Sequence, residues 1–105
     1  MTLISNYVRT RNIDFDGVNR VALTYLPSLL RTWLPDGTRR GQEWVARNPR
    51  RADRRPGSFS VNLTNGKWAD FATGDAGGDV VSLAAYLFDT GQVDAARALA
   101  QLVRL

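Results

Sequence analysis

The side chains best suited to chemistry in this sequence are seven arginines gathered between positions 39 and 55. Only Glu43 and Asp53 oppose them, so this segment has a net charge of +5 and the rest of the chain is close to neutral. Guanidinium groups fork onto phosphate oxygens and stack on bases, and a basic cluster on a near-neutral body is typical of nucleic-acid contact. The simpler interpretation is a surface loop that its charges keep solvated. We predict contact with nucleic acid, through Arg39, Arg40, Arg47, Arg50, Arg51, Arg54, Arg55, Lys67 and Trp68.

Aromatic residues lie close to this cluster in the sequence and could stack on unpaired bases. They are Trp44, Phe59, Trp68 and Phe71. In a domain of this size, aromatic rings also supply much of the core area. We therefore expect Phe59 in the core, whereas Trp68 is the best candidate for base stacking, with a core position as its alternative.

The sequence contains no cysteine and no histidine. A zinc-ribbon site needs thiolate or imidazole ligands, so such a site is excluded, as are disulfides and nucleophilic Cys–His or Ser–His pairs. The carboxylates of Asp70, Asp75 and Asp79 suggest a magnesium site, but hydrogen bonding around a turn explains them more simply. We expect no catalytic residue set, no metal and no other cofactor.

The spacing of apolar residues predicts the helices and strands that carry these side chains. Apolar residues at helical spacing predict a helix over 14–34. Because proline lacks an N–H, this helix is either kinked or divided into two short helices at Leu26-Pro27. Leu34-Pro35-Asp36-Gly37 then predicts a type I turn.

Alternating residues predict strands over 43–47 and 58–63, and Asn65-Gly66 predicts a type I′ turn into a third strand. Pairing Thr64 with Lys67 would place Leu63 opposite Trp68. The same register would put Asp70 beside Val61 on the apolar face, where a bulge or a polar edge would have to accommodate it.

The C-terminal third predicts a turn over 74–78, a helix capped by Asp79 with Val80, Leu83, Ala84, Leu87 and Phe88 on one side, and a last helix over about 93–103. With 105 residues, 44% of them hydrophobic, we expect one domain over 1–105. Its fold class is α+β, with a small three-stranded antiparallel sheet packed against an N-terminal helix and two C-terminal helices. No apolar run has the length of a membrane span or a signal peptide, so we expect a cytoplasmic protein.

The segment 43–79 resembles the small zinc-ribbon domain at the N-terminus of bacterial- and phage-type DNA primases. That family runs Cys-Pro-x-His, a basic loop, Pro-Ser-Phe-Ser-Val, a strand, Cys-x-x-Cys and Gly-Gly-Asp. Asn48-Pro49 is similar to the Cys-Pro start, 56–61 to the central strand and Gly77-Gly78-Asp79 to the closing turn. Counted within this frame, the four ligand positions fall on Asn48, Arg51, Phe71 and Gly74, none of which binds zinc.

The resemblance implies a zinc-ribbon-like module that has lost its metal and folds without it, with Phe71 filling the vacated site. In the family, the ribbon contacts single-stranded template while a neighbouring domain polymerises the primer. We therefore expect a non-enzymatic, single-stranded DNA-binding module of a phage- or plasmid-type primase or primase-helicase, active in DNA replication. It is either an excised domain or a free-standing subunit, and its partners are a primase catalytic domain or subunit, a polymerase or a helicase. The alternative is a protein-interaction adaptor that docks a replicative helicase or polymerase.

Overall fold

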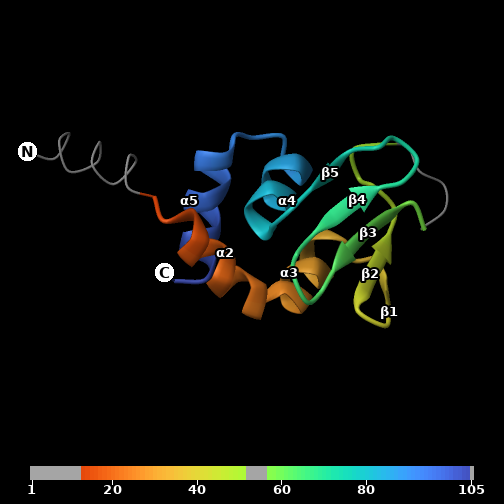
Figure 1. The fold of residues 1–105 in the computed structure, drawn as a ribbon, viewed down its shortest axis with the longest axis horizontal. Helices are drawn as coiled ribbons and strands as arrows, with labels where there is room; N and C mark the ends of the chain where they lie inside the picture. The colour runs from red at the N-terminus through yellow and green to blue at the C-terminus, as the bar shows by residue number, and fades with distance from the viewer. Residues whose placement is uncertain (1–12, 52–56, 105) are drawn as a thin grey trace, which may run out of the picture.

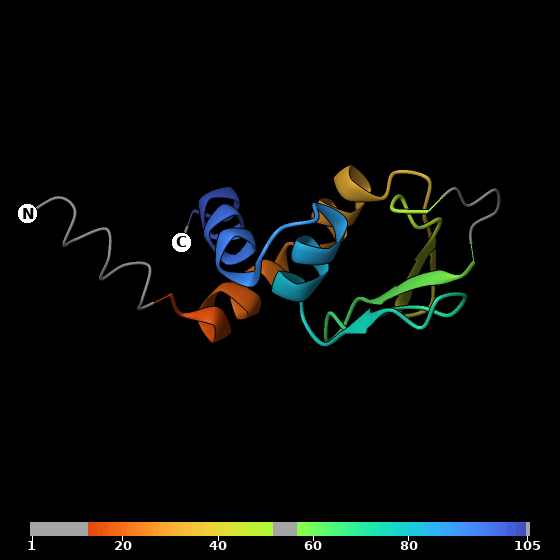
Figure 2. The same ribbon diagram turned by 90° about the horizontal axis from the view of Figure 1, so that it is seen from above.

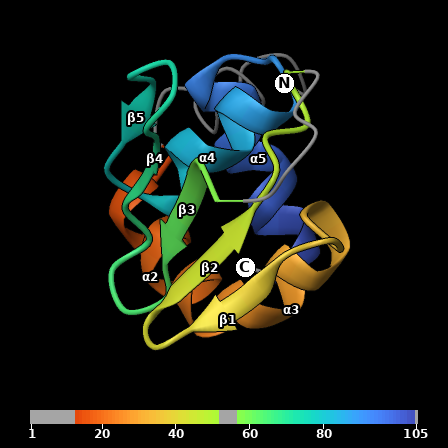
Figure 3. The ribbon, with the colours of Figure 1, turned by 90° about the vertical axis from the view of Figure 1, so that its right-hand side faces the viewer.

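The computed structural model describes residues 13–51 and 57–104 (Figure 1). Within these residues, four helices lie on one side of a five-stranded antiparallel sheet, and the opposite face of the sheet is turned away from them (Figures 2 and 3). The elements are α2 (Phe15–Thr24), α3 (Leu26–Trp33), β1 (Thr38–Arg40), β2 (Glu43–Ala46), β3 (Phe59–Asn62), β4 (Trp68–Asp70), β5 (Ala76–Gly77), α4 (Val80–Leu87) and α5 (Gln92–Leu102).

The N-terminal helical region divides at Tyr25 into α2 and α3, which confirms the two-helix alternative. Asp14 caps α2 by accepting the backbone N–H of Gly17 at 2.8 Å. Pro27 lies in the first turn of α3, where its missing N–H costs no helical hydrogen bond. The chain therefore turns at Tyr25 without losing the apolar stripe that both helices bury.

The sheet has strand order β1-β2-β3-β4-β5, so the prediction of three strands was wrong. The predicted strands correspond to β2, β3 and β4, which bury side chains. All three residues of β1 are exposed, and β5 is only two residues long, within the segment predicted as a turn. Backbone pairing with the neighbouring strands holds these two edge strands in the sheet. Because this pairing does not require buried side chains, the sequence shows little alternation of apolar and polar residues there.

The register of the β3–β4 hairpin differs by two residues from the prediction. Trp68 pairs with Val61 and not with Leu63, and Asp70 pairs with Phe59. Because side chains alternate with a period of two, a shift of two residues leaves every side chain on its predicted face. Asp70 therefore still lies on the apolar side of the sheet, as the sequence indicated.

A longer loop explains the shift. The backbone N–H of Asn62 donates to the carbonyl of Lys67 at 2.7 Å, which leaves four residues in the loop. Gly66 has φ +78°, but Asn65 does not have a positive φ, so the predicted type I′ turn was wrong. The Asn62 side-chain oxygen accepts the backbone N–H groups of Thr64 and Asn65, at 2.8 and 3.0 Å, and so stabilises the wider loop.

The core joins buried side chains of all four helices to those on the inner face of the sheet. Phe59 is fully buried, as predicted, and its ring centroid lies 5.8 Å from that of Trp68. The Trp68 ring in turn lies 4.5 Å from the ring of Tyr86. Its indole N–H donates to Ser82 Oγ at 2.9 Å, which joins β4 to α4.

The C-terminal helices begin where the sequence predicts. Asp79 and Ser82 form a capping box at the start of α4, which confirms the predicted cap. Phe88, predicted on the buried side, lies just after α4 and is 58% exposed. In the described part of the chain, no helix combines the length and the apolar character needed to cross a bilayer.

Candidate nucleic-acid interface

Two of the predicted arginines have local partners near β1. Arg47 forms an ion pair with Asp36, with 3.0 Å between Nε and Oδ2. Burial raises the pKa of Asp36, but hydrogen bonds from the side chain and backbone of Arg47 outweigh this effect and hold that pKa below its ordinary value. Arg39 donates from Nε to the carbonyl of Gly41 at 3.0 Å. The charge of Arg47 is thus partly compensated within the fold.

Arg50 lies in the segment after β2 and contacts the end of α4. Its guanidinium donates to the carbonyl of Tyr86 at 3.1 Å and lies 5.1 Å from the centre of the Tyr86 ring. It also pairs with Asp89 at 3.3 Å. A cation is favoured at the C-terminal end of a helix, so these contacts give Arg50 a structural role.

Arg51 belongs to a polar cluster around Asp70, whose side chain is fully buried. Asp70 Oδ2 accepts from Arg51 Nε at 2.9 Å and from Asn48 Nδ2 at 2.8 Å. Its Oδ1 accepts the backbone N–H of Ala72 at 2.8 Å. Burial raises the pKa of Asp70, but the hydrogen bonds from Asn48, Ala72 and Arg51, with the charge of Arg51, outweigh it and lower that pKa.

Asn48, which is 1% exposed, extends the cluster towards α4. Its Nδ2 also donates to the Tyr86 hydroxyl at 2.8 Å, and that hydroxyl donates to Asp75 Oδ2 at 2.7 Å. Burial and the hydrogen bond to Asp75 raise the pKa of Tyr86. Among the described residues, no buried side-chain nitrogen or oxygen lacks a partner, so this network is complete.

The cluster is built on two loops of similar construction, 48–51 and 70–73. In each loop, the side chain of the first residue accepts the backbone N–H two residues later, at 2.8 Å in both cases. The N–H of the fourth residue also bonds back to the first: Arg51 to the Asn48 carbonyl at 3.1 Å, and Thr73 to Asp70 Oδ1 at 3.3 Å. Two loops that each offer positions i and i+3 have the spacing of paired ligands in a tetrahedral zinc site.

The positions predicted for the second pair of ligands, Phe71 and Gly74, each lie one residue after the first and fourth residues of the second loop, Asp70 and Thr73. Phe71 is 75% exposed, so the expectation that it fills a vacated metal site was wrong. Asp70 meets the first loop instead, because neighbouring residues in an extended chain point to opposite faces. In the described residues, no group of three or more Asp, Glu, His or Cys side chains is placed to hold a metal ion.

The remaining predicted residues divide between core and surface. Trp68 is only 6% exposed and packs against Tyr86, so the hypothesis that it stacks on a base does not fit this fold. Arg40 and Lys67 are exposed, and their side chains form no ion pair or hydrogen bond with other described residues. Arg54 and Arg55 lie outside the residues that the structure describes.

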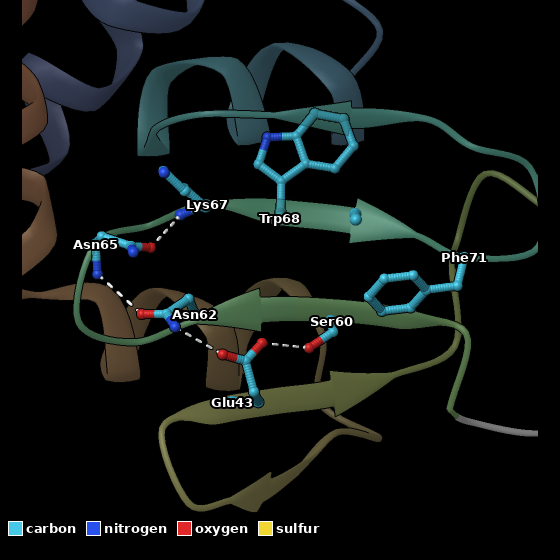
Figure 4. Close-up of a pocket in the computed structure, with 8 residues that line it drawn as sticks. Glu43, Ser60, Asn62, Asn65, Lys67, Trp68 and Phe71 are labelled. Atoms are coloured by element: carbon cyan, nitrogen blue, oxygen red, sulfur yellow. Dashed lines mark hydrogen bonds between the residues drawn. The ribbon is translucent and has the colours of Figure 1, made fainter.

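The outer face of the sheet carries a surface that sequence reasoning missed (Figure 4). A shallow hollow of about 230 Å³ lies there. The Glu43 carboxylate is fixed within it by Ser60 Oγ at 2.6 Å and Asn62 Nδ2 at 2.7 Å. The polar residues that alternate with Phe59 and Val61 were the available signal, since they must face away from the core. The hollow is lined by Glu43, Ser60, Asn62, Asn65, Lys67, Trp68, Ala69 and Phe71.

No protein-family model matches the chain, and neither a curated protein nor a solved structure shows significant similarity to it.

Proposed function

We propose that this chain is a non-catalytic DNA-binding module of a primase or primase-helicase system, which contacts single-stranded template during primer initiation in a mobile element. The observation that carries the proposal is the pair of similar loops, 48–51 and 70–73, joined by buried hydrogen bonds. Their spacing and their position beside an antiparallel sheet support a zinc-ribbon-like frame in which a polar cluster replaces the metal. In such a frame, the partner is a primase catalytic domain or subunit, a polymerase or a helicase.

Charge and exposure indicate which residues contact the strand. The chain has a net charge of +4 without histidine. A guanidinium that already pairs with a carboxylate attracts phosphate less, so Arg47, Arg50 and Arg51 contribute less than the sequence suggested. Arg40 and Lys67 are exposed on the sheet side without such partners among the described residues. We assign the main phosphate contacts to these two residues, together with Arg54 and Arg55, which belong to the same basic stretch of sequence.

The test is a titration of labelled single-stranded DNA by fluorescence anisotropy at several salt concentrations. Each phosphate contact contributes about 0.7 to the slope of log K against log salt on single strands, so Arg40→Ala/Lys67→Ala should reduce the slope by about 1.4. The matched control is Arg20→Ala/Arg31→Ala, which removes the same charge from exposed positions of α2 and α3 on the helical side. Arg54→Ala/Arg55→Ala measures the contribution of these two arginines in the same way.

The proposal requires that the control change the slope less than the Arg40→Ala/Lys67→Ala variant does. Equal slopes for the two double variants would show that binding follows net charge and not this surface. A parent protein that does not bind DNA at low salt would contradict the proposal directly.

A second function, a protein-interaction adaptor, is favoured by one further surface. An apolar hollow of about 470 Å³ lies between α3, the end of α4 and α5. The rings of Trp33 and Phe88 meet edge to face at 5.5 Å in its wall, and Leu102 is 62% exposed. Exposed apolar surface of this kind suits a protein partner. Loss of helicase or polymerase capture in Leu102→Asp, with no DNA binding by the parent, would favour the adaptor.

A further inference from the structure

We propose that the hollow on the outer face of the sheet binds one unstacked guanine of single-stranded DNA. In this arrangement, Phe71 stacks on the base and Glu43 accepts the two adjacent N–H donors of its Watson–Crick edge. The inference rests on the proposed DNA-binding function and adds base selection to it.

Phe71 offers a stacking surface on a fixed backbone. It follows β4 directly, and its backbone N–H donates to the carbonyl of Ser58 at 2.8 Å, so the backbone at Phe71 is anchored. The side chain is nevertheless 75% exposed, at the rim of the hollow (Figure 4). Proteins that bind single strands place aromatic rings in such positions because every base has a face on which to stack.

Glu43 supplies the base-reading group. Its two carboxylate oxygens each accept one hydrogen bond, from Ser60 at 2.6 Å and from Asn62 at 2.7 Å, and these bonds fix the carboxylate in the hollow. A carboxylate has about four acceptor sites, so each oxygen retains capacity for another donor. The carboxylate is thus oriented in advance to accept two parallel N–H groups.

Among the DNA bases, only guanine presents two adjacent N–H donors on its Watson–Crick edge, at N1 and N2. Cytosine and adenine present an amino group next to an acceptor nitrogen, and thymine presents one N–H between two carbonyls. A carboxylate would repel the acceptor atoms of these three bases. Single-stranded bases are read on this edge because it is free of a pairing partner.

Two cations near the carboxylate make the surface compatible with a phosphodiester strand. Arg40 pairs directly with Glu43 across β1 and β2, and Glu43 pairs with Asn62 across β2 and β3. Asn62 in turn is joined through its backbone to Lys67. A positive charge thus lies on either side of the carboxylate, in a row that runs Arg40, Glu43, Asn62 and Lys67. The flanking phosphates would lie at these two charges.

The experiment compares labelled thymine tracts that contain one central guanine, adenine or cytosine, or none. The parent should bind the guanine strand at least about fivefold more tightly, which is the scale of one bidentate base contact. Glu43→Gln should remove this preference while it retains binding to the thymine tract. Phe71→Ala should weaken binding to all strands about tenfold, as expected for a lost stacking contact, and Phe71→Trp should restore it.

The controls separate this site from general effects. Phe15→Ala removes another exposed phenylalanine, at the start of α2 on the helical side, and should leave all affinities unchanged. Replacing the guanine by hypoxanthine removes the N2 amino group without any change in the protein. Affinity should then fall to near that of the thymine tract, even if a Glu43 variant does not fold. Free deoxyguanosine monophosphate should compete only weakly, because it lacks the flanking phosphates.

Equal affinity for all four strands, or equal affinity for guanine and hypoxanthine, would overturn base selection. The proposed function would survive that result if the salt slope still depends on Arg40 and Lys67. Displacement of the strand by an equal concentration of the free nucleotide would instead identify a mononucleotide site. Absence of binding to every strand would overturn both the inference and the proposed function.

Discussion

Asn48 donates a 2.8 Å hydrogen bond from Nδ2 to Oδ2 of Asp70, a residue that follows it by 22 positions. Both side chains are buried, and the bond joins the loop before β3 to the turn after β4. Arg51 adds a charged contact to the same carboxylate oxygen. A metal ion joins two such loops in a zinc ribbon, whereas here an ionised carboxylate does so. The stability of the fold should therefore depend on the charge of Asp70.

Asp70→Asn should destabilise the protein by about 2–4 kcal/mol at neutral pH, because it leaves the half-buried Arg51 without its carboxylate. Since the pKa of Asp70 is lowered in the folded protein, its contribution is present above the ordinary pKa of about 4 and is lost as pH falls below it. Urea unfolding between about pH 7 and pH 3 should show a steep acid loss in the parent and a shallower one in the variant.

The matched control is Asp36→Asn. It removes the partner of Arg47 from an ion pair whose side chains are 47% and 31% exposed, so the expected loss is below about 1 kcal/mol. Equal losses in the two variants would show that the buried cluster contributes no more than a surface ion pair.

A chelator should leave the thermal melt of the parent unchanged, because the chain has no thiolate or imidazole ligand. A variant with cysteine at 48, 51, 70 and 73 should bind one Co²⁺ with a tetrahedral thiolate spectrum, lose that spectrum when Zn²⁺ displaces the Co²⁺, and become sensitive to chelator. The control set places cysteine at 48, 51, 71 and 74, and it should bind metal weakly because Phe71 points to solvent. Equal metal binding by the two sets would contradict the assignment of the loops.

The parts of the fold that could be predicted from the sequence are those that bury side chains. Phe59 and Val61 alternate with polar residues along β3, and Asp79 precedes the apolar run of α4, so both elements carry a local pattern. The exposed strand β1 and the short strand β5 carry no such pattern, because backbone pairing with their neighbours holds them in the sheet.

The candidate site was harder to predict, because its geometry depends on contacts between distant residues. The sequence placed Asp70 on the apolar face but did not show which groups would donate hydrogen bonds to its carboxylate. Its partners, Asn48 and Arg51, come from a loop that the sequence marked only as basic. The sequence frame placed one of its positions on Phe71, which is exposed, whereas the side chain that meets Asn48 and Arg51 is that of the preceding residue, Asp70, on the opposite side of the chain. Glu43 was missed because its role depends on pairing with Asn62 across two strands.

Gly66→Val should destabilise the β3–β4 loop. Gly66 has φ +78°, which β-branched residues rarely adopt, and a Cβ atom there would lie 3.1 Å from Val80 Cγ2. We expect a loss on the order of 1–3 kcal/mol in urea unfolding. Gly78→Val is the control, since Gly78 lies outside the left-handed region and a Cβ atom there meets nothing within 4 Å. A Gly66 variant as stable as the Gly78 variant would contradict the loop conformation.

Trp68 was predicted at the DNA interface but lies in the core, so its substitution should affect stability more than DNA binding. Trp68→Ala removes a ring that is 6% exposed and lies 4.5 Å from that of Tyr86, so it should cost about 3–5 kcal/mol. Trp68→Phe keeps an aromatic ring but loses the indole hydrogen bond to Ser82, so it should cost only about 1–2 kcal/mol. The folded Trp68→Phe protein should bind single-stranded DNA as tightly as the parent, since the ring does not face the strand. A clear loss of DNA affinity in a folded Trp68→Phe variant, with Phe71→Ala unaffected, would instead assign base stacking to Trp68.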